Sequence, residues 1–223
     1  MAFVLTSGNL YQSSLLQKMG WLDHGFGTSS ASPVHVGEMA ASLVQIHSAL
    51  VNPVSKPGER QAEGDGLFTT TPNLWISIRT ADCFPILIAD RNLKAVAAVH
   101  AGWKGTVHQI ARKAVACLID EFGSNPDDLY AAIGPGISEC CFEVGPEVAT
   151  QFEPVFLRPG KAGNSFVNLK QANVSQLLAA GLSPNHIDVA DECSMSTPGF
   201  YSFRRDKTDG RMVSAIRIKK GAA

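Results

Sequence analysis

The chain has 223 residues, 45% of them hydrophobic and 17% charged, and its 19 basic and 20 acidic side chains leave a formal net charge of −1. This composition predicts a single folded domain over residues 1–223 and excludes a disordered chain. The nearly balanced charge gives no excess of basic residues that would bind nucleic acid or an acidic membrane. The first residues lack the basic start of a secretory signal, and no stretch approaches the roughly 18 apolar residues of a membrane span, so we expect a cytoplasmic protein.

Short apolar runs separated by turn residues predict β-strands. In chain order these runs cover residues 43–51, 74–78, 85–89, 95–99, 129–133 and 212–218. Residues 52–61, which follow the first run, are rich in Pro, Gly and charged side chains and predict an exposed loop.

Three segments predict helices. The clearest covers residues 106–122, where apolar residues recur on one face of a 3.6-residue period, with Thr106 as the N-cap and Gly123 as the stop. A second helix is expected over about 168–180 and a short third one after 145–146. Because strands outnumber helices and do not alternate with them strictly, we predict an α+β fold with mixed β-sheets flanked by helices.

Two polar segments lie where predicted strands end. Residues 79–83 separate two strands, and residues 100–106 join a strand to the clearest helix. Cys83 alone is typical of a small buried residue and His100 alone of a hydrogen-bonded structural one. Together at strand ends they suit two chemistries. A thiolate beside an imidazole is an activated nucleophile, and the pair with one more histidine makes a His₂Cys metal set with an open position.

Spacing alone does not select the further histidine from the other five in the chain. His47 is notable because it interrupts an apolar strand pattern, an odd place for an unpaired imidazole. His108 is predicted to face solvent on the helix, His35 lies in a turn rich in Pro and Ser, and His186 opens a strand.

Several blocks resemble one family. In order, these blocks are QIH over 45–47, DGL over 65–67, RTADC over 79–83, PIL over 85–87, HAGWKGT over 100–106, IGPGI over 133–137, CCFEVGPEV over 140–148 and FYSFRRD over 200–206. From about residue 40 onward the chain is therefore similar to the YfiH-like family. This family is also called the laccase-domain or multicopper polyphenol oxidase family and is described as purine nucleoside phosphorylases. Its α+β fold with mixed sheets agrees with the pattern above.

The resemblance implies that His47, Cys83 and His100 are catalytic and bind one metal ion, with zinc as the expected metal and copper as the alternative. It also implies phosphorolysis of adenosine, inosine, guanosine and methylthioadenosine, with adenosine deamination alongside. The expected partners are a small-molecule nucleoside and phosphate, and the protein is expected to be a monomer or a small homo-oligomer.

Three arginines are candidates for binding phosphate. Arg204 and Arg205 follow an aromatic run, and paired arginines can clamp a phosphate group. The competing interpretation is a surface pair at the end of a strand. Arg79 is the third candidate, with a salt bridge to a carboxylate such as Asp82 as its competing role.

Other residues have weaker assignments. Asp65 and Glu192 are candidates for acid–base or supporting roles, and Cys193 for lining the site. Cys140 and Cys141 are expected to pack rather than react, because neighbouring side chains on a strand point to opposite faces. The five cysteines, an odd number in a domain too large to need disulfides, favour a reducing compartment.

The chain departs from the family pattern near its start. Family members carry an H-G-F-x-T-R segment, whereas here HGFGT over 24–28 is followed by Ser29. The segment between Thr28 and His47 also looks shortened. We therefore expect any substrate contact made by that arginine to be absent and the specificity to differ.

Other functions remain open at this stage. A copper-dependent, laccase-like polyphenol oxidase fits the His₂Cys set, but four remaining histidines are too few for a multicopper cluster. A cysteine hydrolase or amidase would use Cys83 as nucleophile and His100 as base, and its activity would survive chelation but not alkylation. A binding module without activity is the last alternative.

Overall fold

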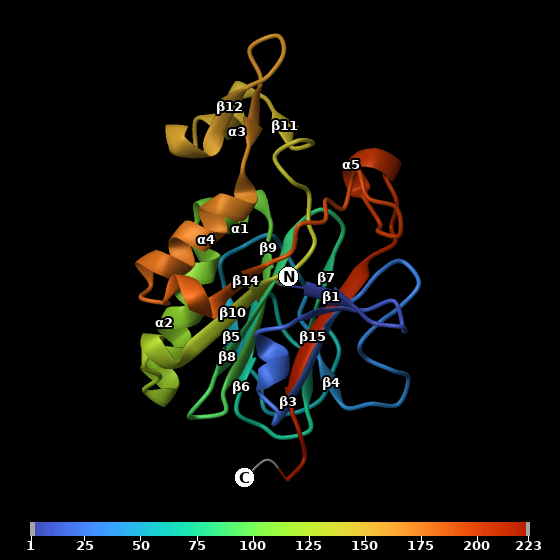
Figure 1. The fold of residues 1–223 in the computed structure, drawn as a ribbon, viewed down its shortest axis with the longest axis vertical. Coiled ribbons are helices and arrows are strands. Elements are labelled where there is room, and N and C mark those ends of the chain that lie inside the picture. Colours follow the sequence, from blue (N-terminus) through green and yellow to red (C-terminus); the bar gives the residue numbers. More distant parts are fainter. Residues whose placement is uncertain (1–2, 222–223) are drawn as a thin grey trace.

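The computed structural model describes residues 3–221. Two six-stranded sheets lie against each other, helices cover the outer face of one of them, and a small three-stranded sheet projects from one end (Figure 1). Both large sheets contain parallel and antiparallel pairs. The predicted α+β class with mixed sheets is therefore confirmed.

The first large sheet contains the first and last strands of the described chain. Its strand order is β1 (Phe3–Leu5), β2 (Tyr11–Ser13), β3 (Leu22–Phe26), β15 (Met212–Ile218), β7 (Trp75–Thr80) and β4 (Ala40–Ala41). Among the strand pairs of this sheet within residues 3–221, only that of β4 with β7 is parallel. The runs predicted over 74–78 and 212–218 are β7 and β15, so both strand predictions are confirmed.

The second large sheet is the middle layer. Its order is β14 (Ile187–Val189), β10 (Leu129–Ile133), β8 (Phe84–Asp90), β9 (Val96–Ala101), β6 (Gly66–Thr69) and β5 (Val51–Pro53). The small sheet has the order β11 (Glu143–Val144), β13 (Ser165–Val167) and β12 (Leu157–Pro159). The runs predicted over 85–89, 95–99 and 129–133 are confirmed as β8, β9 and β10.

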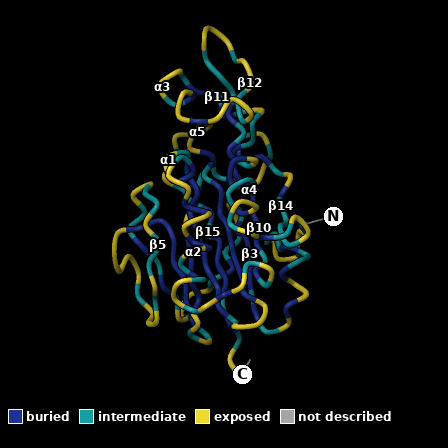
Figure 2. Tube along the Cα trace, turned by 90° about the vertical axis from the view of Figure 1, so that its left-hand side faces the viewer, coloured by how far each residue is buried: buried dark blue, intermediate teal, exposed yellow. Residues whose placement is uncertain are grey.

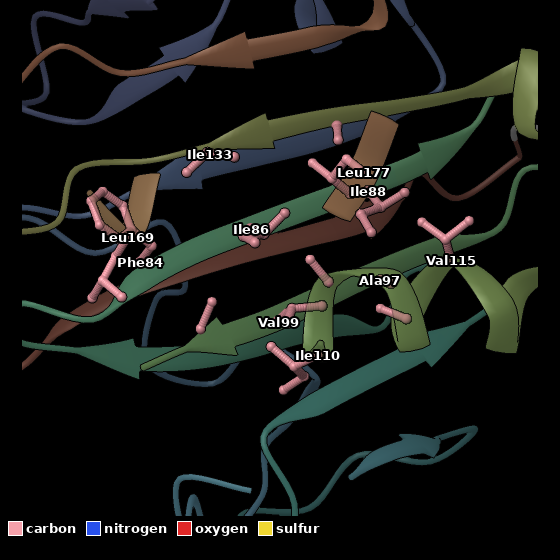
Figure 3. Packing of buried hydrophobic residues seen from close by; sticks show 14 of the residues in the cluster. Phe84, Ile86, Ile88, Ala97, Val99, Ile110, Val115, Ile133, Leu169 and Leu177 are labelled. Carbon is pink, nitrogen blue, oxygen red and sulfur yellow. The ribbon is translucent and has the colours of Figure 1, made fainter. Parts of the chain in front are cut away.

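The core has two parts because the middle sheet is buried on both faces. Alternate residues of β8, such as Ile86 and Ile88, pack with Val99 of β9 against the helices, as Figure 3 shows. Their neighbours Leu87 and Ala89 pack against the other sheet. In Figure 2 the central strands are buried while exposed residues gather on the connecting loops. This continuous burial holds the strand ends, where polar residues follow, in fixed positions.

The helices are α1 (Trp103–Val107), α2 (Ile110–Phe122), α3 (Pro146–Ala149), α4 (Leu169–Ala179) and α5 (Phe203–Asp206), together with the short 3-10 turns η1 (Leu16–Lys18), η2 (Pro126–Asp128), η3 (Pro154–Phe156) and η4 (Pro184–His186). The helices predicted over 168–180 and after 145–146 are confirmed, and the side chain of Asn168 caps α4 by accepting from the Gln171 amide. Within residues 3–221 no helix is long and apolar enough to cross a membrane.

The continuous helix predicted over 106–122 is wrong at its start. Two helices are present, and Gln109 between them is left-handed with φ +60°. Thr106 does not cap a helix. Its hydroxyl accepts from Asn173, and its carbonyl accepts from Gln176, both on α4. Thr106 therefore makes hydrogen bonds to α4 in place of the N-cap bond that the sequence predicted. At the other end, Gly123 ends α2 in the left-handed conformation, as expected.

The strand predicted over 43–51 is also wrong. Only Val51 belongs to a strand, β5, and the preceding residues form a turn in which His47 is left-handed with φ +58°. The backbone amides of Ile46, His47 and Ser48 all donate to the carboxylate of Asp65. These three bonds wrap the segment around one buried side chain, which a ladder of strand hydrogen bonds would not allow.

Candidate functional site

His47, Cys83 and His100 come together at one end of the middle sheet. Cys83 lies in the turn between β7 and β8, His100 is in β9, and His47 projects from the turn around Asp65. The ligand atoms of the three side chains all lie within 4.8 Å of one another, and the two imidazole centroids are 5.0 Å apart. The structure thus brings together the three residues for which the sequence predicted a metal site.

Gly102 lets these three side chains approach one another. A Cβ atom at this position would lie 3.0 Å from Cys83 Sγ and 3.1 Å from His47 Cδ2. Both distances are tighter than ordinary van der Waals contact. A side chain here would push two of the three ligands apart, so the glycine of the HAGW block has a steric role that the sequence did not indicate.

Asp65 organises the site from behind. Its fully buried carboxylate lies 2.7 Å from His100 Nδ1, accepts from the amide of His47 at 3.0 Å, and accepts from the Ser48 hydroxyl at 2.7 Å. Because Nδ1 of His100 contacts Asp65, Nε2 is the nitrogen available to bind a metal ion. A carboxylate behind a ligand histidine is the usual way in which proteins fix the ring and its tautomer. The predicted supporting role of Asp65 therefore has a clear geometric basis.

The electrostatics of the site favour a thiolate. Burial alone would raise the pKa of Cys83, but the charge of His100 and hydrogen bonds from His100 and His47 outweigh it and lower the pKa to about 6. Burial likewise would lower the pKa of His100, but the Cys83 thiolate and Asp65 raise it to about 9. Two imidazoles and one thiolate are the donor set of a catalytic zinc site with three protein ligands. The residues present therefore fit a zinc ion.

A cleft of about 930 Å³ opens over His47, Cys83 and His100. Five cationic side chains line it, against three acidic ones; the cations are Arg60, Arg79, Arg204, Lys207 and Arg211. Two aromatic rings, those of Phe142 and Phe203, also line the cleft. The cleft is within the size range of sites for small organic ligands, and its excess of cations suits an anionic group.

The predicted arginines separate into two groups. Arg79 and Arg204 line the cleft, and the Arg204 guanidinium lies 5.2 Å from the centre of the Phe142 ring. Arg205 is turned into its own loop, where it pairs with both oxygens of Asp206 and donates to the carbonyls of Ser194, Met195 and Phe200. Its donors are thus taken up by loop contacts, and it does not line the cleft.

Asp82, the competing partner proposed for Arg79, has a different role. Its carboxylate accepts from the Ser194 hydroxyl at 2.8 Å and from the backbone amide of Arg204 at 2.7 Å. Asp82 therefore fixes the loop that presents Arg204 next to Cys83. Glu192 contacts the Tyr11 hydroxyl, whose pKa is raised by burial and by this carboxylate, and it does not line the cleft.

The cysteines outside the ligand set also depart from expectation. Cys140 and Cys141 lie in a turn, not on a strand, and their sulfurs are 3.3 Å apart, so the prediction that they point to opposite faces is wrong. Cys193 is buried beside them and does not line the cleft.

One wall of the cleft comes from a segment that sequence reasoning described only as shortened. Ser32, Val34, His35 and Val36 border the cleft together with Ala40, Ser42 and Leu43. Gln45, just after this segment, exchanges two hydrogen bonds of 2.8 Å with the backbone of Arg79. This segment therefore contributes to the shape of the cleft.

Known proteins resemble this chain over most of its length. A purine nucleoside phosphorylase of Deinococcus radiodurans is 38% identical over 184 residues, 81% of this chain and 70% of that protein. The purine nucleoside phosphorylase YfiH of Escherichia coli is 33% identical over 78% of this chain and 72% of its own length. The crystal structure of YlmD from Geobacillus stearothermophilus superposes with a TM-score of 0.88 at 26% identity, covering 98% of this chain and 99% of YlmD.

The family model described as multi-copper polyphenol oxidoreductase laccase matches residues 29–219. This range contains the three convergent side chains, the supporting Asp65, and Arg79 and Arg204 of the cleft. The resemblance seen in the sequence blocks is thus confirmed by the family match and by the fold. The chain belongs to the laccase-domain family, whose relatives include YfiH and YlmD.

Proposed function

We propose that this protein is a zinc-dependent purine nucleoside phosphorylase that also deaminates adenosine. The observation that carries the proposal is the opening of the His47–Cys83–His100 set into a cleft lined by cations. Metal donors and anion-binding groups in one cleft suit a reaction between a nucleoside and phosphate. The names of the related proteins support the same activity.

The cationic wall would bind the attacking phosphate. Arg79 and Arg204 border the same cleft, and guanidinium groups bind phosphate oxygens with two parallel hydrogen bonds. In the reaction, a bond forms between a phosphate oxygen and C1′ of the ribose while the bond from C1′ to the purine nitrogen breaks. The base leaves with the electron pair and takes up the proton of the phosphate. Holding both reactants in line accounts for a large share of such catalysis.

His47, Cys83 and His100 would hold the metal, and Asp65 would keep His100 in the tautomer that leaves Nε2 free. A bound zinc ion supplies Lewis acidity and lowers the pKa of water to about 7, which suits attack on C6 of adenine. Copper fits the same donor set. The five cysteines are all free, in keeping with the reducing, cytoplasmic setting we propose.

A cysteine hydrolase is the second candidate, favoured by one observation. Asp65, His100 and Cys83 form a chain in which the thiol has a pKa of about 6, as in an activated nucleophile. Against it stands His47, which that mechanism does not use. A multicopper centre has weaker support, because in the described chain the remaining histidines His24, His35, His108 and His186 belong to no cluster of metal donors.

Metal analysis combined with adenosine turnover tests the proposal. The purified chain would be assayed with and without phosphate, before and after chelation, and after re-addition of Zn²⁺. We expect adenine only when phosphate is present, inosine independently of phosphate, and loss of both products on chelation. Cys83→Ala should lose metal and both activities, whereas His108→Gln, at an exposed position on the end of α1, should retain them.

The alternatives give opposite results. Activity that survives chelation but is abolished by alkylation would identify a cysteine hydrolase instead. Wild-type metal content in the Cys83→Ala protein would remove this site from the proposal altogether.

A further inference from the structure

A second group of donor atoms lies behind the wall of the cleft. The sulfurs of Cys140, Cys141 and Cys193 all lie within 4.8 Å of one another, and those of Cys140 and Cys141 are 3.3 Å apart. The first two residues precede β11, and the third follows β14. Three thiols from two distant segments thus converge at a place that the proposed reaction does not use.

The backbone fixes this convergence. Gly136 and Cys193 form an isolated parallel bridge, and the amide of Ser194 donates to the Gly136 carbonyl at 3.0 Å. The amide of Ser138 donates to Cys193 Sγ at 3.3 Å. The two loops are therefore hydrogen-bonded to each other next to the thiols, and the sulfurs are held in position before any ligand binds.

The spacing suits a soft metal ion. Zinc–thiolate bonds of about 2.3 Å in tetrahedral geometry separate two sulfurs by roughly 3.8 Å. The separation of 3.3 Å between Cys140 and Cys141 is shorter than that value, and no two of the three sulfurs are more than 4.8 Å apart. Thiolates select soft cations such as Zn²⁺ and Cu⁺ over hard ones. Small side-chain rotations would therefore place all three sulfurs on one ion.

The cluster is enclosed by protein on one side and open on the other. Cys193 is buried and Cys141 is half-buried. Cys140 is exposed and gives a path from solvent.

We propose that Cys140, Cys141 and Cys193 form a second metal site, which takes a thiophilic cation of the Zn²⁺ or Cu⁺ type. Such an ion would tie together the two loops that support the cleft. On one loop, the hydroxyl of Ser194, next to Cys193, donates to Asp82, which neighbours Cys83. On the other, the ring of Phe142, next to Cys141, packs against the Arg204 guanidinium. The second site would therefore have a structural role and stands independently of the proposed reaction.

Titration of the reduced, metal-free full chain with Cd²⁺ tests this inference. Absorption by thiolate-to-metal charge transfer counts the sulfurs, and ¹¹³Cd NMR separates a site with one thiolate from a site with three. We expect two equivalents in the wild type, with the three-sulfur signal lost in Cys140→Ser. Cys117→Ser, a cysteine of α2 outside both groups, should retain both signals.

Two further variants keep the test decisive. His47→Ala should lose only the one-sulfur signal, so that failure of the proposed catalytic site is distinguishable from failure of this one. Cys193→Ser should behave as Cys140→Ser does. A single equivalent in the wild type, or a three-sulfur signal that persists in both cysteine variants, overturns the assignment. Displacement of Cd²⁺ by Zn²⁺ or by Cu⁺ shows which of the two ions the site binds more tightly. Cd²⁺ that neither ion displaces also overturns the assignment.

Discussion

The carboxylate of Asp65 contacts Nδ1 of His100 at 2.7 Å while it caps the turn that carries His47. One buried side chain thus orients two of the three convergent ligands. Burial alone would raise the pKa of Asp65, but hydrogen bonds from His100 and Ser48 hold it below its ordinary value. The carboxylate therefore stays ionised at neutral pH and fixes the His100 ring and the turn that carries His47.

Replacing Asp65 by Asn should weaken metal binding more than it affects folding. The amide keeps the size of the side chain but removes the charge behind His100 and presents one acceptor where two oxygens now serve. Losses of such supporting carboxylates cost about 10- to 100-fold in metal affinity. Competition for Zn²⁺ with a chromophoric chelator would measure the effect.

Asp90→Asn is the matched control. Asp90 is also a buried carboxylate that caps backbone amides, those of Asn92 and Leu93, but it lies at the opposite end of β8 from the ligands. We expect this variant to change the free energy of unfolding and leave zinc affinity unaltered. An Asp65→Asn protein with wild-type zinc affinity would contradict the role assigned to Asp65.

Gly102→Ala should separate the ligands while leaving the backbone relaxed. Gly102 has φ −75°, which any residue adopts, so the effect comes from the added methyl group against Cys83 and His47. We expect zinc affinity to fall by roughly tenfold, the lower end of the range found when groups that orient metal ligands are lost. Gly20→Ala, where nothing lies within 4 Å of the new atom, should bind zinc like the wild type. Equal zinc affinity in the two variants would show that the approach at Gly102 is not needed.

The strands that the sequence predicted well are those whose signal is local. β10 and β15 coincide with the expected runs, because apolar residues there end at turn residues. Residues 43–51 have an equally apolar pattern, yet Asp65 draws three of their amides into a turn. A partner so far along the chain leaves no trace in the local pattern, so this error could not be avoided by periodicity alone.

The residues of the candidate site likewise divide into those that local sequence signals identify and those that depend on distant contacts. Cys83 and His100 could be found from residue type and position at strand ends, whereas His47 required the family resemblance. Arg204 and Arg205 look equivalent in sequence, but the adjacent Asp206 and three carbonyls engage only Arg205. The Cys140–Cys141 pair was misjudged because it lies in a turn. Side-chain direction in turns depends on contacts that the sequence does not display.

Substitution of Arg79 or Arg204 by Ala should weaken the binding of phosphate without loss of metal. Both side chains line the cleft, and charge-assisted hydrogen bonds to a phosphate are each worth about 1.5–3 kcal/mol. We therefore expect KM for phosphate to rise by at least about tenfold. Initial rates at varied phosphate, with zinc content measured in parallel, would test this.

Arg205→Ala separates a binding role from a structural one. Its guanidinium holds the carbonyls of Met195 and Phe200 and pairs with Asp206. We expect a lower Tm, because these carbonyls lose their donors, and an unchanged KM for phosphate in the protein that remains folded. If Arg205→Ala raised the KM for phosphate as much as is expected of Arg79→Ala, the assignment of Arg205 to a structural role would be wrong.

His24 makes the stability of the fold dependent on pH. It is buried in β3, where its Nε2 accepts from the amide of Ser13 at 2.9 Å, so the ring is neutral in the native state. Burial lowers its pKa from 6.5 to about 4, against the smaller opposing effect of Asp23. Between these two values the unfolded chain binds the proton and the native chain does not.

Stability contributed by neutral His24 should therefore be lost as the pH falls from 6.5 towards 4. The expected loss between pH 7 and pH 5 is about 2 kcal/mol. Urea unfolding of the metal-free protein at both pH values would measure it, since chelation keeps pH-dependent metal binding out of the comparison. His24→Gln should flatten this dependence by the same amount, whereas His108→Gln, at an exposed position, should leave it intact. Identical pH profiles for the wild type and His24→Gln would mean that other groups carry the acid sensitivity of the fold.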